Sequence, residues 1–226
     1  MEAGGNVTAG PITFSPGVGS SYGNGWRQLW KYFLELLLVI IIYGVISVPI
    51  GTIGWVVHGP FWDIVSCAYN LLLLGPVGYG VAYACLKASR GDKLEIKDIF
   101  AAFQNYWNAV LASLLVTVIV VIGFILIIVP GFIFLCKLAF TPYLVVDRKM
   151  EVIEAVKASW KMTNGHGWKV FLIGLLGILI GIAGLICLGV GIIIAGMWIM
   201  LALASLYHAV STSGKIAAEQ PSPIVA

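Results

Sequence analysis

The side chains best suited to metal binding or nucleophilic catalysis are few in this sequence and lie far apart. The three histidines, His58, His166 and His208, form neither an HxxxH pair nor a His/Cys cluster. The cysteines stand singly within or beside apolar runs, without the paired spacing of zinc and redox motifs. They are Cys67, Cys85, Cys136 and Cys187. We expect them to be small buried apolar side chains, and we predict no catalytic residue, metal site or cofactor.

Lys137 is the residue whose position is most unusual for its type. It lies near the middle of an apolar run, and an ammonium at the centre of a bilayer costs roughly 2.5–3.5 kcal/mol on insertion scales. One interpretation is that Lys137 binds an anion or a lipid headgroup. The alternative is a packing role, in which Lys137 extends toward the interface or pairs with Glu35. Glu35 itself follows Lys31 by four residues, which also predicts an ordinary pair between those two.

The amino-acid composition indicates the kind of fold that holds these residues. Hydrophobic residues make up 60% of the 226 residues and charged residues only 10%, whereas soluble domains carry roughly a quarter charged residues. The apolar residues form long blocks, and one membrane-spanning helix needs about 20 of them. We therefore predict an all-α transmembrane helix bundle. Its expected spans are 33–57, 64–86, 107–129, 131–146, 170–188 and 190–210.

These six spans are expected to form three hairpins. The apolar run that contains Lys137 is broken at Pro130 and Gly131, and the last run is broken at Gly189 and Gly191. Glycine and proline are the usual residues at such breaks. The same pattern also fits shallow hairpins that enter and leave on one side, although the length of the runs favours full spans.

Four glycines recur at intervals of three and four residues along the expected fifth helix. They are Gly174, Gly177, Gly181 and Gly184. Small residues at this spacing let a second helix approach closely. We expect this face to pack within the chain, and the alternative is a contact between two copies.

Two short amphipathic stretches precede the last two hairpins. In the first, Ile96, Ile99, Phe100 and Phe103 share a helical face, and in the second Val152, Val156 and Trp160 do so. Their polar faces carry lysines: Lys93, Lys97, Lys157 and Lys161. Such helices either lie flat at the membrane surface, with their cations at anionic headgroups, or pack against the protein's own bundle.

Basic residues predict the orientation, because cytoplasmic loops retain Lys and Arg. Twelve of the 13 basic residues fall on one side of the expected spans, Lys137 being the exception. This places both termini in the cytoplasm. We expect residues 1–25 to be a flexible segment without a cleaved signal peptide, 26–210 to be the transmembrane domain and 211–226 to be a tail.

The middle of the chain resembles a known family. Val129-Pro130-Gly131-Phe132 and Pro142-Tyr143, followed by Ser159-Trp160 and Trp168, are similar to bacterial six-helix membrane proteins related to the membrane domain associated with glycerophosphoryl diester phosphodiesterases. The resemblance implies the membrane architecture and the inner membrane of a prokaryote. It does not imply the phosphodiesterase activity, which belongs to a separate catalytic domain.

Three functions remain open from the sequence. The first is a non-enzymatic membrane module that organises lipids, anionic headgroups among them, or partner membrane proteins, with a homodimer as one form. The second is a small transporter or channel whose pathway includes Lys137. The third, a lipid-processing enzyme, lacks a nucleophile or a metal with a matching base. No basic soluble segment suggests a nucleic-acid partner.

Overall fold

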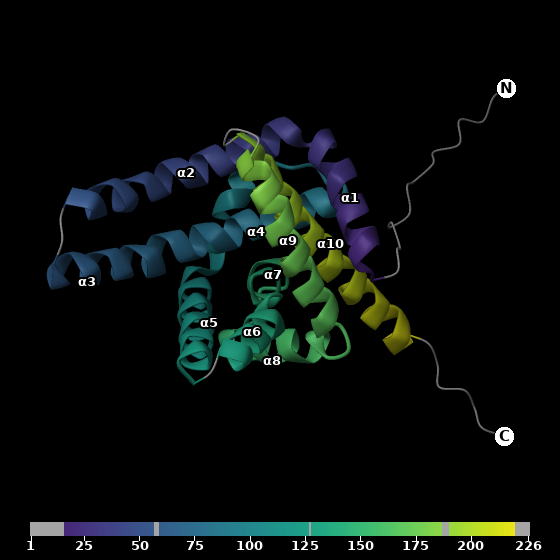
Figure 1. The fold of residues 1–226 in the computed structure, drawn as a ribbon. Coiled ribbons are helices and arrows are strands. Elements are labelled where there is room, and N and C mark those ends of the chain that lie inside the picture. Colours follow the sequence, from purple (N-terminus) through teal and green to yellow (C-terminus); the bar gives the residue numbers. More distant parts are fainter. Residues whose placement is uncertain (1–15, 57–58, 127, 187–189, 220–226) are drawn as a thin grey trace, which may run out of the picture.

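The computed structural model describes residues 16–56, 59–126, 128–186 and 190–219, and within them every regular element is helical (Figure 1). Five helices are long and apolar enough to cross a membrane, or six if the bent pair formed by the first two helices is one span. The all-α prediction is confirmed, and the helices indicate a multi-pass membrane protein. His58, Cys187 and Gly189 lie outside the described residues.

The first two helices meet at a sharp bend. Helix α1 (Val18–Lys31) and the apolar helix α2 (Phe33–Val56) are bent by 91° at Tyr32. The expectation that residues 1–25 are flexible is wrong for residues 18–25, which are helical. Tyr22 and Leu29 recur seven residues apart on the buried face of α1, so burying this stripe against the bundle stabilises a Gly- and Ser-rich segment.

A single long apolar segment follows and contains an irregular turn. Helix α3 (Pro60–Tyr69) continues through the π-helical turn η1 (Asn70–Leu74) into α4 (Gly75–Arg90). Pro76 has no N–H to donate to the carbonyl of Leu72 four residues earlier. That carbonyl instead accepts the hydroxyl of Tyr106 at 2.9 Å.

The two later hairpins differ in their second arms. Helix α5 (Tyr106–Leu126) pairs with α6 (Ile128–Leu138), and the apolar run then breaks before α7 (Thr141–Asp147). Pro142 in the first turn of α7 cannot donate to the preceding turn, which explains the break. In contrast, α9 (Gly167–Ile186) pairs with α10 (Val190–Glu219), which is continuous. The expected tail 211–226 therefore begins as helix.

The two amphipathic stretches are helical but are rotated from the expected orientation. The first is the 3-10 helix η2 (Ile96–Asn105) and the second is α8 (Val152–Thr163). Helix η2 buries Ile99 and Ala102, whereas Phe100 and Phe103 are exposed. Helix α8 buries the small stripe Ala155, Ser159 and Thr163. Each helix therefore packs on the bundle through one face and leaves its aromatic side chains exposed.

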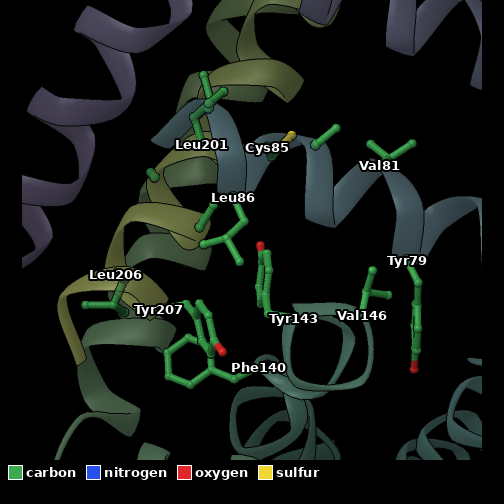
Figure 2. Packing of buried hydrophobic residues seen from close by; sticks show 14 of the residues in the cluster. Tyr79, Val81, Cys85, Leu86, Phe140, Tyr143, Val146, Leu201, Leu206 and Tyr207 are labelled. Atoms are coloured by element: carbon green, nitrogen blue, oxygen red, sulfur yellow. The ribbon is translucent and has the colours of Figure 1, made fainter. Parts of the chain in front are cut away.

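The core lies where α4, α7 and α10 meet. Figure 2 shows Leu86 of α4 above the rings of Tyr143 and Tyr207. Those two rings stack with centroids 5.0 Å apart, and Phe140 meets Tyr207 edge-on at 5.5 Å. These large side chains are fully buried or nearly so. In Figure 1, the hairpin of α2 and α3 extends away from this core, and no residue of α3 is buried.

Candidate functional site

Lys137 is held by the interfacial helix α8. Its ammonium donates a hydrogen bond to the side-chain oxygen of Asn164, the residue that caps α8, and lies 5.5 Å from the centre of the Trp160 ring. An ammonium over an aromatic face is a stabilising arrangement that needs no ligand. The geometry therefore favours the packing interpretation of Lys137 over a ligand or pathway role.

The backbone of Lys137 is also engaged. Its carbonyl accepts the hydroxyls of Ser159 at 2.8 Å and Thr163 at 2.9 Å. Carbonyls in the last turn of a helix have no partner within that helix, and α6 ends one residue later. Two hydroxyls of α8 thus cap α6, which attaches the interfacial helix to the break in the fourth span.

Glu35 does not form either of the two predicted ion pairs among the described residues. Its side chain is exposed near the start of α2. The bend at Tyr32 separates Lys31 from Glu35, so the four-residue spacing does not place them on one continuous helix. The ammonium of Lys31 lies instead 4.9 Å from the centre of the Tyr32 ring.

The contacts of Lys137 lead to a prediction. We expect Lys137→Met to leave the amount of bound phosphatidylglycerol unchanged and to lower the unfolding free energy by less than about 1 kcal/mol, because an exposed cation–π contact contributes little. Native mass spectrometry and thermal melting in detergent measure both, with the exposed Lys149→Met as the control. Loss of bound lipid from Lys137→Met alone would return Lys137 to a binding role.

The four stripe glycines divide into two pairs. Gly177 and Gly184 are buried against α10, where a Cβ on Gly184 would lie 2.6 Å from the Gly191 carbonyl oxygen. Gly174 and Gly181 have nothing within 4 Å of the corresponding position. The first pair therefore packs within the chain, as we expected, and the second lies on an open face.

The residues assigned to hairpin turns lie inside helices where they are described. Pro130 and Gly131 belong to the first turn of α6, which begins at Ile128, whereas α5 ends at Leu126. Proline fits a first turn because the N–H that it lacks would have no helical acceptor there. A Cβ on Gly131 would meet the Phe124 ring at 2.6 Å. Similarly, Gly191 of α10 lies against Gly184 of α9. These glycines permit close contact between hairpin arms.

A polar pocket, which the sequence reasoning missed, lies between the ends of α4 and α7 and the C-terminal half of α10. Its volume is about 320 Å³, near the lower end for small-ligand sites. The lining residues are Arg90, Asp147, Arg148, His208, Ser211 and Thr212. All of its lining side chains are polar, although the pocket lies beside the aromatic cluster of Phe140, Tyr143 and Tyr207.

An ion pair forms one wall of this pocket. Arg90 donates to both oxygens of Asp147, at 2.7 and 2.8 Å, and the Tyr207 hydroxyl donates to Asp147 at 3.4 Å. The two charged side chains are mostly covered, with exposed fractions of 25% and 14%. Such a bidentate pair has a defined geometry and joins the end of α4 to the end of α7.

Hydroxyl groups line the wall that α10 contributes. Ser211 and Thr212 each donate to the carbonyl of His208 at 2.9 Å. The sequence does contain two features that could have indicated the pocket, because Arg90 and Asp147 carry opposite charges and each follows a long apolar run. Sequence spacing could not show that these ends meet, because 57 residues separate them.

Exposed aromatic side chains beside cations form a second candidate surface. On η2 and α5, Phe100, Phe103 and Tyr106 follow one another with ring centroids 5.9 and 5.6 Å apart, and Trp107 continues the row at 5.6 Å. On α1, Trp26 and Trp30 lie edge to face at 5.6 Å. Trp30 is 56% exposed and Trp107 69%, so these rings are not core residues.

Lysines accompany these rings on the same elements. Lys97 lies on η2, where it pairs with Glu95 at 2.6 Å, and Lys157 and Lys161 lie on α8 with Trp160. The ammonium of Lys97 holds the pKa of the Glu95 carboxyl below its usual value. Tryptophan, tyrosine and lysine together are typical of membrane interfaces.

Metal-binding side chains and cysteines are the remaining candidates among the described residues. Within the described residues, no three His, Cys, Asp or Glu side chains form a group that could hold a metal ion. Cys85 is buried as predicted, Cys136 is half-buried, and Cys67 is exposed on α3, which contradicts the expectation for that residue. It is exposed because α3 packs against little else.

No family model, curated protein or solved structure matches this chain. The resemblance to bacterial six-helix membrane proteins therefore stays a prediction. The established description of the molecule is that of an all-α protein whose apolar helices indicate several membrane crossings.

Proposed function

We propose that this protein is a non-enzymatic membrane module that organises anionic lipids around itself. The observation that carries the proposal is the set of exposed aromatic rings and lysines on α1, η2 and α8. Each of these elements packs on the bundle through one face and leaves large aromatic side chains exposed, among them Trp30, Phe100 and Trp160. That arrangement suits acyl chains and headgroups, since aromatic rings and cations each have a favourable partner at the interface.

The proposal includes a location and an orientation. The chain resides in the inner membrane of a prokaryote, with both termini and the lysine-bearing helices in the cytoplasm. The cytoplasmic leaflet carries anionic lipids, so this side is where the lysines would act. The open face at Gly174 and Gly181 is available to a partner membrane protein or to a second copy.

The experiment compares two variants of the interfacial lysines. One replaces them with glutamine and the other with arginine, at Lys93, Lys97, Lys157 and Lys161. A cation near an anionic surface contributes about 1 kcal/mol, so we expect the glutamine variant to bind phosphatidylglycerol at least about tenfold more weakly. The arginine variant should bind like the wild type, because it keeps the charge.

Titration of the detergent-purified proteins with phosphatidylglycerol and with phosphatidylcholine, followed by native mass spectrometry, measures these affinities. Melting temperatures show whether each variant is folded. Equal phosphatidylglycerol binding by the wild type and the glutamine variant would contradict the proposal. A wild-type preference for phosphatidylcholine would do the same.

A further inference from the structure

The polar pocket lies where three candidate membrane spans end. These spans are Pro60–Arg90, Pro130–Asp147 and Gly191–Ser213. Arg90 and Asp147 are the last residues of two of them, and Thr212 is the last but one of the third. Because each apolar stretch stops at this level, the pocket belongs at the boundary between hydrocarbon and water, which is the depth of lipid phosphates.

The charged side chains that line the pocket carry a net positive charge, with Asp92 outside the lining but close enough to act on Arg90 and His208. Arg90 and Arg148 supply two positive charges and Asp147 supplies one negative charge, which leaves +1 without counting His208. Asp147 accepts one hydrogen bond from each terminal nitrogen of the Arg90 guanidinium. Arg148 forms no ion pair with any other described residue. The excess positive charge therefore sits at Arg148, directly on the pocket wall.

The pocket also offers several donors around one volume. A guanidinium presents its N–H groups in a planar fork that matches phosphate oxygens. Arg90 keeps N–H groups that Asp147 does not use, and the hydroxyls of Ser211 and Thr212 can rotate from the His208 carbonyl toward an anion. Donors from three helices thus converge on one space, whereas a single exposed lysine would offer only a point charge.

We propose that this pocket binds a phosphate group, with Arg148 as its main charge partner and Arg90 held in place by Asp147. The phosphate belongs either to a lipid headgroup or to free inorganic phosphate, since both present the same oxygens. The lipid form of this proposal rests on the proposed function and gives it a specific site. The bidentate pair with Asp147 orients Arg90, and the volume of about 320 Å³ accommodates the group with some water.

The test compares two neighbouring cations. Arg148 and the next residue, Lys149, are both exposed, but only Arg148 lines the pocket. Arg148→Gln and Lys149→Gln therefore remove the same charge from nearly the same place on the surface. The probes are phosphatidylglycerol, measured by native mass spectrometry, and inorganic phosphate, measured by its effect on the melting temperature with chloride as the control salt.

We expect Arg148→Gln to weaken binding of one probe about tenfold, because it removes a charge-assisted contact. Lys149→Gln should change it by less than about twofold, because an exposed charge is screened. A loss confined to phosphatidylglycerol identifies a lipid headgroup, and a loss confined to inorganic phosphate identifies the free ion. Either result supports the site.

Two results would overturn it. Equal weakening by both variants would mean that the surface acts only through its overall charge. No effect of Arg148→Gln on either probe would mean that the pocket holds no phosphate. Neither result tests the proposed function, which depends on the separate comparison of glutamine and arginine at the interfacial lysines. If the glutamine variant bound phosphatidylglycerol like the wild type while Arg148→Gln still weakened binding, the proposed function would fail and the phosphate site would stand.

Discussion

Replacing Gly80 with alanine is expected to cost more than about 3 kcal/mol of unfolding free energy, the largest effect of any single change considered for this protein. A Cβ on Gly80 would lie 1.6 Å from the carbonyl oxygen of Ile99 and 2.5 Å from its carbonyl carbon. Both atoms are backbone, so no side-chain rotation relieves the overlap. Helix η2 would have to move away from α4, and the buried Asp98, which pairs with Lys87 at 2.8 Å, would move with it.

Gly78 provides the control for this change. It lies two residues earlier on α4 and has nothing within 4 Å of a Cβ position. Gly78→Ala should therefore leave the melting temperature in detergent nearly unchanged, while Gly80→Ala lowers it sharply or prevents folding. Hydrogen exchange should show η2 losing protection first in any folded Gly80→Ala protein. Similar melting temperatures for the two variants would show that η2 does not rest on α4 in this way.

The second large effect is expected at Asn24. Its side-chain nitrogen donates to the Ser89 carbonyl and to the Ser205 hydroxyl, both at 3.0 Å, and only 2% of the residue is exposed. Asn24→Ala leaves both acceptors buried without this donor and opens a small cavity. Each unsatisfied buried group costs about 1–3 kcal/mol, so we expect a loss of about 2–4 kcal/mol.

Asn70 is the matched control because it is also a helical asparagine but is exposed. Its side chain donates to Ser66 within its own helix, at 2.8 Å. Asn70→Ala should change the unfolding free energy by less than about 0.5 kcal/mol. Proteolysis of folded Asn24→Ala should cut within α1, because Asn24 joins α1 to α4 and α10. Unchanged resistance of α1 to protease would contradict this assignment.

Hydropathy predicted most of the apolar helices to within a few residues: the run expected to end at residue 86 continues to Arg90, and the run expected to end at 146 ends at Asp147. The third expected span differs more, because the candidate span Ile96–Ile125 begins well before the expected start at residue 107. Such runs are long, and a block of apolar residues has few ways to satisfy its backbone other than a helix. The breaks were less predictable, because Pro130 fits a first helical turn as well as a loop.

The roles of individual polar residues were less predictable. The sequence identified Lys137 as unusual, but its partners Asn164 and Trp160 lie on another helix, 20 or more residues further along the chain. The ion pair expected between Lys31 and Glu35 does not form, because a 91° bend separates the two residues. Spacing rules hold only along a continuous helix, so a bend at one residue removes their basis.

Hydropathy alone was enough to predict a membrane environment, the helical class and the approximate ends of the apolar segments, because hydrocarbon admits few backbone structures. Only the tertiary structure shows which helix ends lie next to one another. It brought Arg90, Asp147 and His208 from three helices into one pocket and placed α1 on α10. It also determined which face of η2 and of α8 packs on the bundle. The physical reason is that hydropathy specifies how deep a residue lies, whereas close contacts between helices specify how each helix is rotated.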